Sequence, residues 1–506
     1  MATACADSPG CPGGEKRRLV EQAEITPVDV LKNKAAGRKP AAFSFEILEM
    51  TLKRPLLRKI CCMLFAATFA ATPVVAAQQD SGPNLIRDAE IEGLLRQFAR
   101  PIFKAAKIND SSVTVYLIAD DSINAFVAGG QRIFVHTGIF TKTKSPNEVI
   151  GVLAHETGHI AGGHLARMNN ELATANTERI IGMLAGVAAM VGGAATGNDA
   201  AARAGQGVVI GSQTAAQRGF LSYQRSMESA ADQAALKYLQ ATGQSPRGML
   251  SLFQALANES LAATSGADPY AFSHPMPFDR IRTLEVEAKK SPYFDKGDNP
   301  ALVLRYQLAK AKLIGFMQST QRVYQRYPST DKSLPARYAR SIALFRHGDI
   351  KNALPIIDSL INDVPQDPYF WELKAQALLE NGQAANGIPA IERARKLLPN
   401  NGLLQLLNAQ ILIGTEKPEN ADKALTLLTL AKRTEGDTPD LFKQMAAAYA
   451  IKGDVPRAEL ATAEYAWAIG DKEMALKRAK RAQDAFKHGS KEWLRANDLL
   501  TFASRK

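Results

Sequence analysis

A five-residue segment, His155–His159 with the sequence H-E-T-G-H, restricts what this chain can fold into more than any other part of it. Residues four apart on a helix lie on one face, so the two imidazoles can reach one metal ion. Apolar residues lead into the motif from Val149, and Ile160–His164 follows it. A polar cluster within an apolar helix is costly to bury unless something such as a metal ion satisfies it. We therefore expect a metal-binding helix over residues 148–168 rather than a surface helix with a polar turn.

The motif also supplies a general base and calls for a third ligand. Glu156 directly follows the first imidazole and can reach a metal-bound water. A catalytic zinc site needs one more protein ligand, and the best candidate lies about 70 residues later. Glu228 and Asp232 are one helical turn apart among alanines, so a buried helix over residues 228–239 can bring one carboxylate to the metal while the other orients a ligand. Zn²⁺ suits such a site because it takes imidazole and carboxylate ligands and keeps one position open for water.

These two motifs, in this order, resemble the M48 family of zinc metallopeptidases, and the resemblance covers roughly residues 85–290. It implies a zincin-like fold with a small β-sheet, one Zn²⁺ per chain, and hydrolysis of peptide bonds. It also implies that His155, His159 and Glu228 are the metal ligands. Glu156 would be the catalytic base, and the carboxylate of Asp232 would orient a ligand.

Two further segments resemble the same family. Residues 121–138 resemble its β-segment beside the cleft, against which a substrate backbone can align. His274-Pro275, followed by Arg280-Ile281, resembles its H-P-x-x-x-x-R-I element. The resemblance leaves two roles for His274, which either stabilises the oxyanion or occupies the open zinc position in the resting enzyme. Arg280 either positions substrate or supports the structure.

The remaining histidines are weaker candidates. His164 lies five residues after His159, whereas zinc proteases with a third histidine ligand place it six residues after the second. We therefore expect His164 to support a ligand or to lie at the surface. His136 ends a predicted strand and is expected to be structural, and His347 and His488 lie in polar turns without an assigned role.

The N-terminal region has the pattern of an export signal. Basic residues at 53–59 precede an apolar run, Ile60–Ala71, and then the small residues Val75–Ala77. This pattern predicts a signal peptide over residues 50–77, because the apolar run is too short for an ordinary membrane span. The alternatives are an internal anchor or a buried helix. We expect residues 1–49 to be a non-native or disordered extension.

Composition sets limits on the chemistry and the partners. All four cysteines lie before residue 78, so the mature chain would have no thiol, no disulfide and no cysteine-ligated zinc. The formal net charge is +12, but no basic tract is interleaved with aromatic residues, so nucleic-acid binding is not expected. A mildly basic surface can favour peripheral contact with an anionic membrane.

Residues 180–211 form a glycine-rich apolar segment within the catalytic region. Its first apolar stretch is too short and too rich in glycine to be read as a membrane span. We expect either a helical hairpin or flap near the cleft that touches lipid, or a buried helix pair packed on the catalytic core.

The C-terminal region shows a 34-residue period. Gly348 and Pro365 recur as Gly382 and Pro399, and the register continues after an insertion of about three residues to Gly453. This helix–turn–helix period resembles tetratricopeptide repeats. Each unit buries its apolar face only against its neighbours, so several units should stack and present a concave surface to a protein partner. An irregular helical bundle is the alternative.

The sequence thus predicts a mainly α protein with a zincin-like metalloprotease domain at 78–295 and an α-solenoid of tetratricopeptide-like repeats at 300–506. A signal peptide joined to these two regions resembles a group of periplasmic proteases of Gram-negative bacteria. That resemblance implies a zinc endopeptidase, periplasmic or peripheral to the outer membrane, acting on unfolded or misassembled outer-membrane proteins, with repeats that dock the outer-membrane assembly machinery. The alternatives are a chaperone or scaffold with secondary proteolysis, and a membrane-embedded protease.

Overall fold

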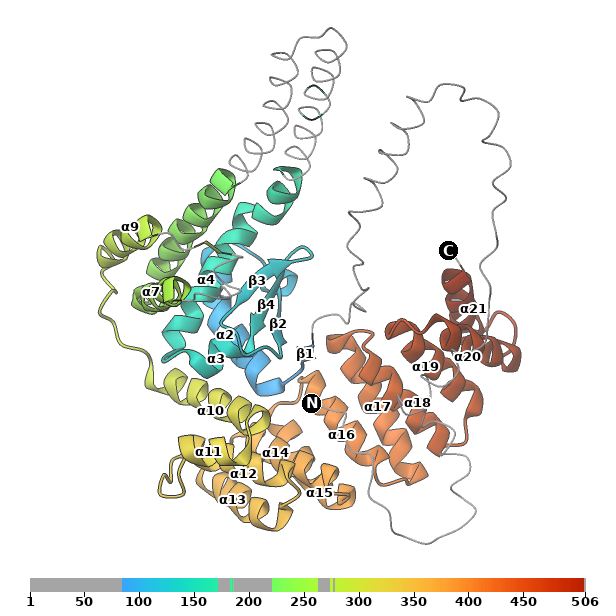
Figure 1. Cartoon of the computed structure of the whole chain (residues 1–506). Coiled ribbons are helices and arrows are strands. Elements are labelled where there is room, and N and C mark those ends of the chain that lie inside the picture. The colour runs from blue at the N-terminus through green and yellow to red at the C-terminus, as the bar shows by residue number, and fades with distance from the viewer. Residues whose placement is uncertain are drawn as a thin grey trace, which may run out of the picture. The chain divides into compact units, whose positions relative to one another are not determined.

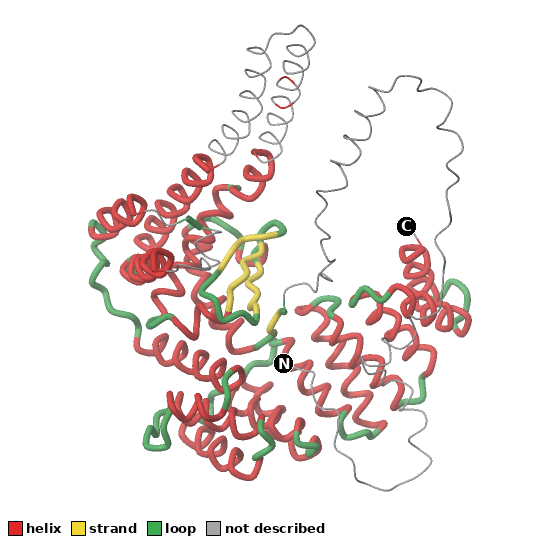
Figure 2. The backbone as a smooth tube through the Cα atoms, viewed as in Figure 1, coloured by secondary structure: helices red, strands yellow, loops and turns green. Residues whose placement is uncertain are grey.

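The computed structural model of the chain describes residues 84–171, 221–262, 274–275 and 278–504, together with residues 183 and 185. These residues form helices and one small sheet, as Figure 2 shows. The predicted fold class, a mainly α protein with a small sheet followed by a helical repeat region, is confirmed. The expected extension at 1–49, the signal peptide at 50–77 and nearly all of the 180–211 segment lie outside the described residues. In the part of the chain that is described, every helix is too short or too polar to span a bilayer.

The sheet has four strands in the order β1-β2-β4-β3. Their bounds are Leu85–Ile86 for β1, Thr114–Ile118 for β2, Ala125–Ala128 for β3 and Arg132–His136 for β4. Strands β2 and β4 are neighbours in the sheet and run parallel, so no tight turn joins them directly. The hairpin partner of β4 is β3, across the three residues 129–131, and Gly129 and Gly130 there both have positive φ (57° and 97°).

The helices of the catalytic region pack on and around this sheet (Figure 1). They are α2 (Ala89–Ala105), the short η4 (Asp110–Ser112), α3 (Thr137–Lys142), α4 (Pro146–Gly162), a helix over residues 221–241, α7 (Arg247–Ala262) and α9 (Phe278–Lys289). Helices α2 and α4 contact each other, while α2 also contacts β2 and α4 also contacts β3. One core therefore joins sheet and helices, with Phe98, Ile133, Leu153 and Phe253 all buried in it.

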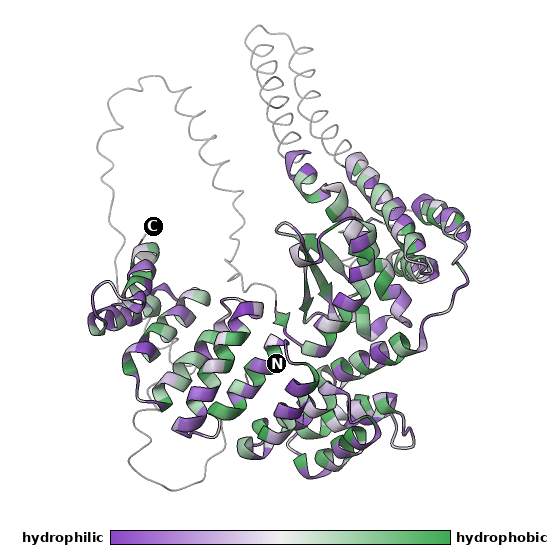
Figure 3. Cartoon of the chain, turned by 180° about the vertical axis from the view of Figure 1, so that it is seen from behind, coloured by the Kyte–Doolittle hydropathy of each residue, from purple (hydrophilic) through white to green (hydrophobic). Residues whose placement is uncertain are grey.

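The repeat region is a succession of helices that each contact the next. Their bounds are α10 (Pro300–Met317), α11 (Thr320–Arg326), α12 (Leu334–Arg346), α13 (Ile350–Asp363), α14 (Pro368–Glu380), α15 (Ala384–Leu397), α16 (Gly402–Ile413), α17 (Pro418–Glu435), α18 (Pro439–Ile451), α19 (Val455–Ala468), α20 (Lys472–Ala485) and α21 (Lys491–Ser504). Figure 3 shows hydrophobic and hydrophilic bands alternating along these helices, as expected when one side of each is buried.

The 34-residue period has a backbone cause. Gly348, Gly382 and Gly453 follow the first helix of their pairs with φ between 72° and 79°, the left-handed region that glycine adopts readily. In the intervening pair this position falls on Glu416, which has φ 56° without being glycine. The insertion of about three residues lies after Glu416, in α17. This helix has 18 residues, whereas α15, the equivalent helix of the preceding pair, has 14.

The catalytic and repeat regions meet at the start of α2 around a buried lysine. Lys312 of α10 is 3% exposed, and its Nζ lies 2.7 Å from Asp88 Oδ2, 3.2 Å from Glu372 Oε2 and 3.6 Å from Glu90 Oε2. Asp88 is the N-cap of α2, Glu90 lies in its first turn, and Glu372 belongs to α14. Tyr338 of α12 donates its hydroxyl proton to Glu90 Oε2 at 2.9 Å. We call these five residues the junction cluster.

Candidate metal centre and active site

Helix α4 carries the H-E-x-x-H motif into the centre of the catalytic region. Every residue of α4 from Pro146 to Gly158 is buried. Gly158 lets the helix over residues 221–241 approach closely, because a Cβ there would lie 2.8 Å from the carbonyl oxygen of Ala231. Any larger side chain at Gly158 would separate the two helices. The glycine inside the motif therefore brings the Glu228 helix within reach of the two histidines.

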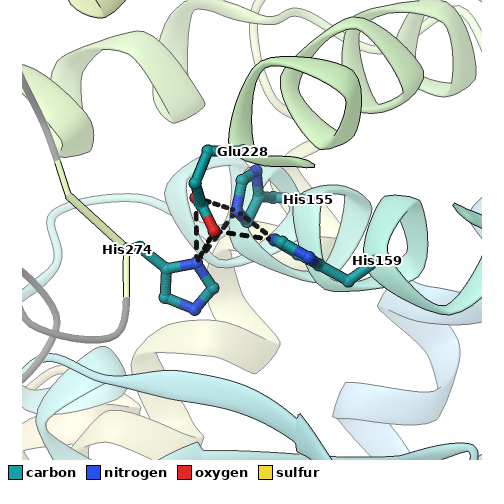
Figure 4. A group of neighbouring side chains, drawn as sticks. All are labelled: His155, His159, Glu228 and His274. Atoms are coloured by element: carbon teal, nitrogen blue, oxygen red, sulfur yellow. Dashed lines mark hydrogen bonds and ion pairs between the residues drawn. The ribbon is translucent and has the colours of Figure 1, made fainter. Parts of the chain in front are cut away.

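Four side chains converge at this point, as Figure 4 shows. The Nε2 atoms of His155 and His159 lie 3.0 Å apart. Glu228 Oε2 is 3.3 Å from His155 Nε2, and Glu228 Oε1 is 3.3 Å from His159 Nε2. His274 Nδ1 lies 3.1 Å from both Glu228 oxygens and 3.3 Å from His155 Nε2. We call these four residues the cage.

The donor set of the cage fits a zinc ion. Tetrahedral Zn²⁺ with bonds of 2.0–2.1 Å places its ligand atoms about 3.3–3.4 Å apart, close to the spacing of the cage atoms. His155 and His159 turn their Nδ1 atoms to other partners and their Nε2 atoms to the cage, so each ring, when neutral with its proton on Nδ1, would offer a nitrogen lone pair to a metal. Two lone pairs 3.0 Å apart repel each other unless a cation lies between them. The residues present therefore suit a bound metal better than a hydrogen-bonded cluster.

A second layer of charge lies behind the cage. His155 Nδ1 is 3.0 Å from Asp232 Oδ1, although the contact lacks the alignment of a full hydrogen bond. Arg280 donates to both oxygens of Asp232 at 2.6 and 2.8 Å, and its Nη1 lies 2.9 Å from Glu228 Oε2. Asp232 and Arg280 thus fix the orientation of His155 and Glu228 from behind. Of the two roles left open for Arg280, its contacts are those of structural support.

Burial and neighbouring charges push the pKa values in this site apart. Burial opposes the charged form of His155, but Asp232 and Glu228 outweigh it and raise its pKa to about 9. Burial also dominates at His159, where only Glu228 opposes it, and lowers its pKa to about 3. The pKa of Glu228 is held well below its ordinary value despite burial, because three histidines face it, His274 most strongly. Carboxylate and neutral imidazole are the protonation states that a metal needs from Glu228 and His159.

Glu156 differs from every other carboxylate near the cage. It is fully buried, and neither of its side-chain oxygens has a hydrogen-bond partner among the described residues. The ring of His274 lies beside it, with Nε2 3.5 Å from Glu156 Oε1. Burial raises the pKa of Glu156, which makes it a stronger proton acceptor than an exposed glutamate. A buried carboxylate without a hydrogen bond, beside a metal cage, is costly to fold and suits a general base.

His274 is placed among the ligand atoms. Its Nδ1 faces Glu228 and His155, and its Nε2 lies 3.3 Å from the carbonyl oxygen of Ala125 in strand β3. Strand β3 is the last strand of the sheet, so its outer edge pairs with no other described strand. His274 thus connects the cage to the edge where an extended peptide can add to the sheet.

The structure brings together all six residues that the sequence predicted, and it adds one that the sequence left undecided. His164, 6% exposed, lies with its Nδ1 3.0 Å from the Nδ1 of His159, on the side away from the cage. The spacing of His164 from His159 in the sequence indicates only that His164 is not a direct metal ligand. It does not predict the contact with His159, because that contact depends on the break in the helix at Gly163. His136 contacts Ser122, and the His488 ring lies tilted against that of Trp493, both away from the cage.

Comparison with known proteins agrees with this geometry. The profile of peptidase family M48 matches residues 86–288. The chain is 25% identical over 373 residues to the beta-barrel assembly-enhancing protease of Yersinia pestis, covering 71% of this chain and 74% of the relative. It is 23% identical over 343 residues to the protein of that name from Escherichia coli (strain K12), covering 66% and 67%. It is 27% identical over 188 residues to the metalloprotease YcaL of the same strain, covering 36% and 65%.

The matched region contains every element that builds the cage, from the sheet to the first turn of α9. The order of the motifs, the convergence of the ligand atoms and the family match all point to one activity. The chain therefore carries a peptidase family M48 domain and is a metallopeptidase related to the beta-barrel assembly-enhancing proteases.

Proposed function

We propose that this chain is a zinc-dependent endopeptidase that cleaves unfolded or misassembled proteins. The observation that carries the proposal is Glu156, whose buried carboxylate has no hydrogen-bond partner among the described residues and lies beside four converging ligand atoms. A structural zinc site has no use for such a group, because a buried carboxylate without a hydrogen bond only costs stability. In a hydrolase the same carboxylate can act as the general base.

The chain's own residues divide the reaction between them. His155, His159 and Glu228 would hold the ion, which supplies Lewis-acid polarisation of the scissile carbonyl and lowers the pKa of its bound water to about 7. Glu156 accepts the proton that the attacking water loses and delivers it to the nitrogen of the leaving amine. Asp232 keeps its carboxylate on His155, and burial and Arg280 hold Asp232 in turn.

Metal analysis combined with a proteolysis assay tests this proposal. The purified protein should contain about one zinc per chain and should degrade unfolded casein, and a chelator should stop the degradation. Glu156→Gln should keep the zinc and the fold while losing about 10²- to 10⁴-fold in rate, the usual contribution of a general base. Asp120→Asn, at an exposed carboxylate in the same domain, is the matched control and should keep the wild-type rate. Casein cleavage by Glu156→Gln at the wild-type rate would refute the assignment.

We infer that His274 restrains the resting enzyme by taking the fourth position of the cage. The position of its Nδ1 among the ligand atoms supports this role over that of oxyanion stabiliser. His274→Ala should therefore keep zinc on the other three ligands and should increase the rate of casein cleavage. Unchanged or lower cleavage at full zinc occupancy would exclude restraint, and a lower rate would favour the oxyanion role.

The relatives and the N-terminal sequence support a location and a substrate class. Two relatives are named for enhancing the assembly of β-barrels, and the sequence predicts a signal peptide at 50–77. We therefore propose export to the periplasm, with substrates among misassembled outer-membrane proteins. The repeats over 300–506, which we propose to be tetratricopeptide-like, would dock the outer-membrane assembly machinery. If Glu156→Gln supports barrel assembly in cells as well as wild type, the alternative of a chaperone or scaffold is the better description.

A further inference from the structure

His164 contacts the rear nitrogen of His159, and the two Nδ1 atoms lie 3.0 Å apart. We propose that His164 is a positioning residue for the metal centre: it holds His159 in the tautomer and ring orientation that present Nε2 to the cage. The proposal rests on the proposed zinc site and adds to it the device that completes the second histidine ligand.

A break in the helix brings His164 to this position. On a continuous helix, five residues turn the chain by about 500°, which leaves side chains about 140° apart and on different faces. Gly163 interrupts the helix with φ 61° in the left-handed region, and residues 164–171 are helical again beyond it. The break turns His164 back toward His159.

The neighbouring glycine makes room for the ring. A Cβ at Gly162 would lie 2.2 Å from His164 Nε2 and 2.5 Å from its Cδ2, so the His164 ring would have to move. Gly162 thus leaves the space that the His164 imidazole fills, and Gly163 supplies the turn. Both glycines of the sequence I-A-G-G-H are therefore needed to place the His164 side chain against His159.

The positions of the protons follow from the direction of the two rings. His159 needs a bare Nε2 toward the cage, so its Nδ1 carries the proton and donates it to His164 Nδ1. His164 then accepts at Nδ1 and keeps its own proton on Nε2. With the opposite tautomer, His159 would aim an N–H bond at His155 Nε2 and could not bind a metal.

The two ligand histidines are therefore supported differently. His155 has the carboxylate of Asp232 behind it, and His159 has the neutral ring of His164. Partners of ligand histidines commonly contribute about 10- to 100-fold to metal affinity. We expect a loss in this range when the acceptor at position 164 is removed, even though His164 itself touches no metal.

Substitutions at His164 can separate an acceptor from a space-filling ring. His164→Phe keeps the ring and removes the acceptor, so zinc affinity measured by chelator competition at fixed pH should fall about 10- to 100-fold. His164→Asn places an oxygen near the former Nδ1 and should recover most of the affinity. His164→Gln places its oxygen nearer the former Nε2 and should recover less. His136→Phe, at a histidine of similar burial that contacts Ser122 instead of the cage, should leave zinc affinity unchanged.

The melting temperature of the chelator-treated proteins distinguishes positioning from folding. Wild-type affinity in His164→Phe, or equal affinity in the Asn and Phe variants when their zinc-free forms melt alike, would overturn the proposal. If His164→Phe does not fold, the ranking of Asn above Gln is decisive alone. A wild-type protein that binds no zinc would instead overturn the proposed function, and wild-type zinc binding with normal proteolysis in all His164 variants would overturn only the inference on His164.

Discussion

The cage and the junction cluster are both groups of buried ionic side chains, and they differ in what completes them. In the junction cluster the chain supplies its own cation, since Lys312 lies within 3.6 Å of three carboxylates. In the cage, imidazole lone pairs and a carboxylate point at a shared centre, and the nearest arginine, Arg280, approaches Glu228 from behind. The junction cluster, whose cation comes from the chain itself, holds the two regions together. The cage, whose side chains converge on a metal site, carries the chemistry.

The largest effect that would sharpen this comparison is expected from Lys312→Met. Removing one partner of a buried ion pair leaves the other charges uncompensated and typically costs about 3–5 kcal/mol. The free energy of unfolding of the zinc-loaded protein should therefore fall by that amount, while the zinc affinity of the folded protein stays at the wild-type value. Urea unfolding and chelator competition measure the two quantities.

Lys452→Met is the matched control for this substitution. Lys452 pairs with Asp422 at the surface of the repeat region, where an ion pair contributes about 0–1 kcal/mol. If Lys312→Met is no more destabilising than Lys452→Met, the junction cluster does not hold the two regions together. If Lys312→Met instead weakens zinc binding, the two clusters are coupled and the comparison fails.

The two clusters also differ in how far the sequence reveals them. Local spacing predicts three of the cage residues, because His155 and His159 share a helix face, as do Glu228 and Asp232. The fourth, His274, is indicated only by the resemblance of its segment to the family's H-P-x-x-x-x-R-I element. The junction cluster joins Asp88 to a lysine more than 200 residues away, and no local pattern marks either residue. Asp88 reads as an ordinary helix cap, which it also is, and Lys312 reads as one of many exposed lysines.

The same contrast explains the rest of the comparison between sequence and structure. The repeats were visible because Gly348 and Gly382 recur where the backbone needs positive φ. The pairing of β2 with β4 was not, because strand order depends on contacts between segments that sequence periodicity does not encode. The sequence leaves His164 open between supporting a ligand and lying at the surface, because helical spacing assumes an unbroken helix, and Gly163 breaks it.

A second prediction concerns the pH dependence of the junction cluster. Burial raises the pKa of Glu90 from 4.5 to about 8, with Lys312 opposing and Asp367 and Asp88 adding to the rise. The folded protein therefore holds a proton that the unfolded chain releases near pH 4.5. This contribution is fully present below that pH and is lost as the pH rises toward 8, by about 1.4 kcal/mol per pH unit if Glu90 alone titrates.

Glu90→Gln tests this sign because the amide resembles the protonated acid at every pH. The variant should show a flatter fall in the free energy of unfolding between pH 5 and 8, and it should be more stable than wild type at pH 8. The fall should not vanish, since burial also raises the pKa of Glu372. An unchanged slope in Glu90→Gln would show that Glu90 stays ionised, with Lys312 outweighing the cost of burying it.

The smallest effect is expected at the rim of the junction, from Arg87→Ala. The Arg87 guanidinium contacts Glu92 at 2.7 Å and also pairs with Glu435 of α17, but its side chain is 30% exposed. Water and salt screen such a pair, so the free energy of unfolding should fall by no more than about 1 kcal/mol, and by less at high salt. Urea unfolding at low and high salt measures both. If Arg87→Ala lowers the free energy of unfolding as much as Lys312→Met does, the buried lysine among three carboxylates contributes no more stability than one partly solvated ion pair. The main attachment of the repeats would then lie at this rim.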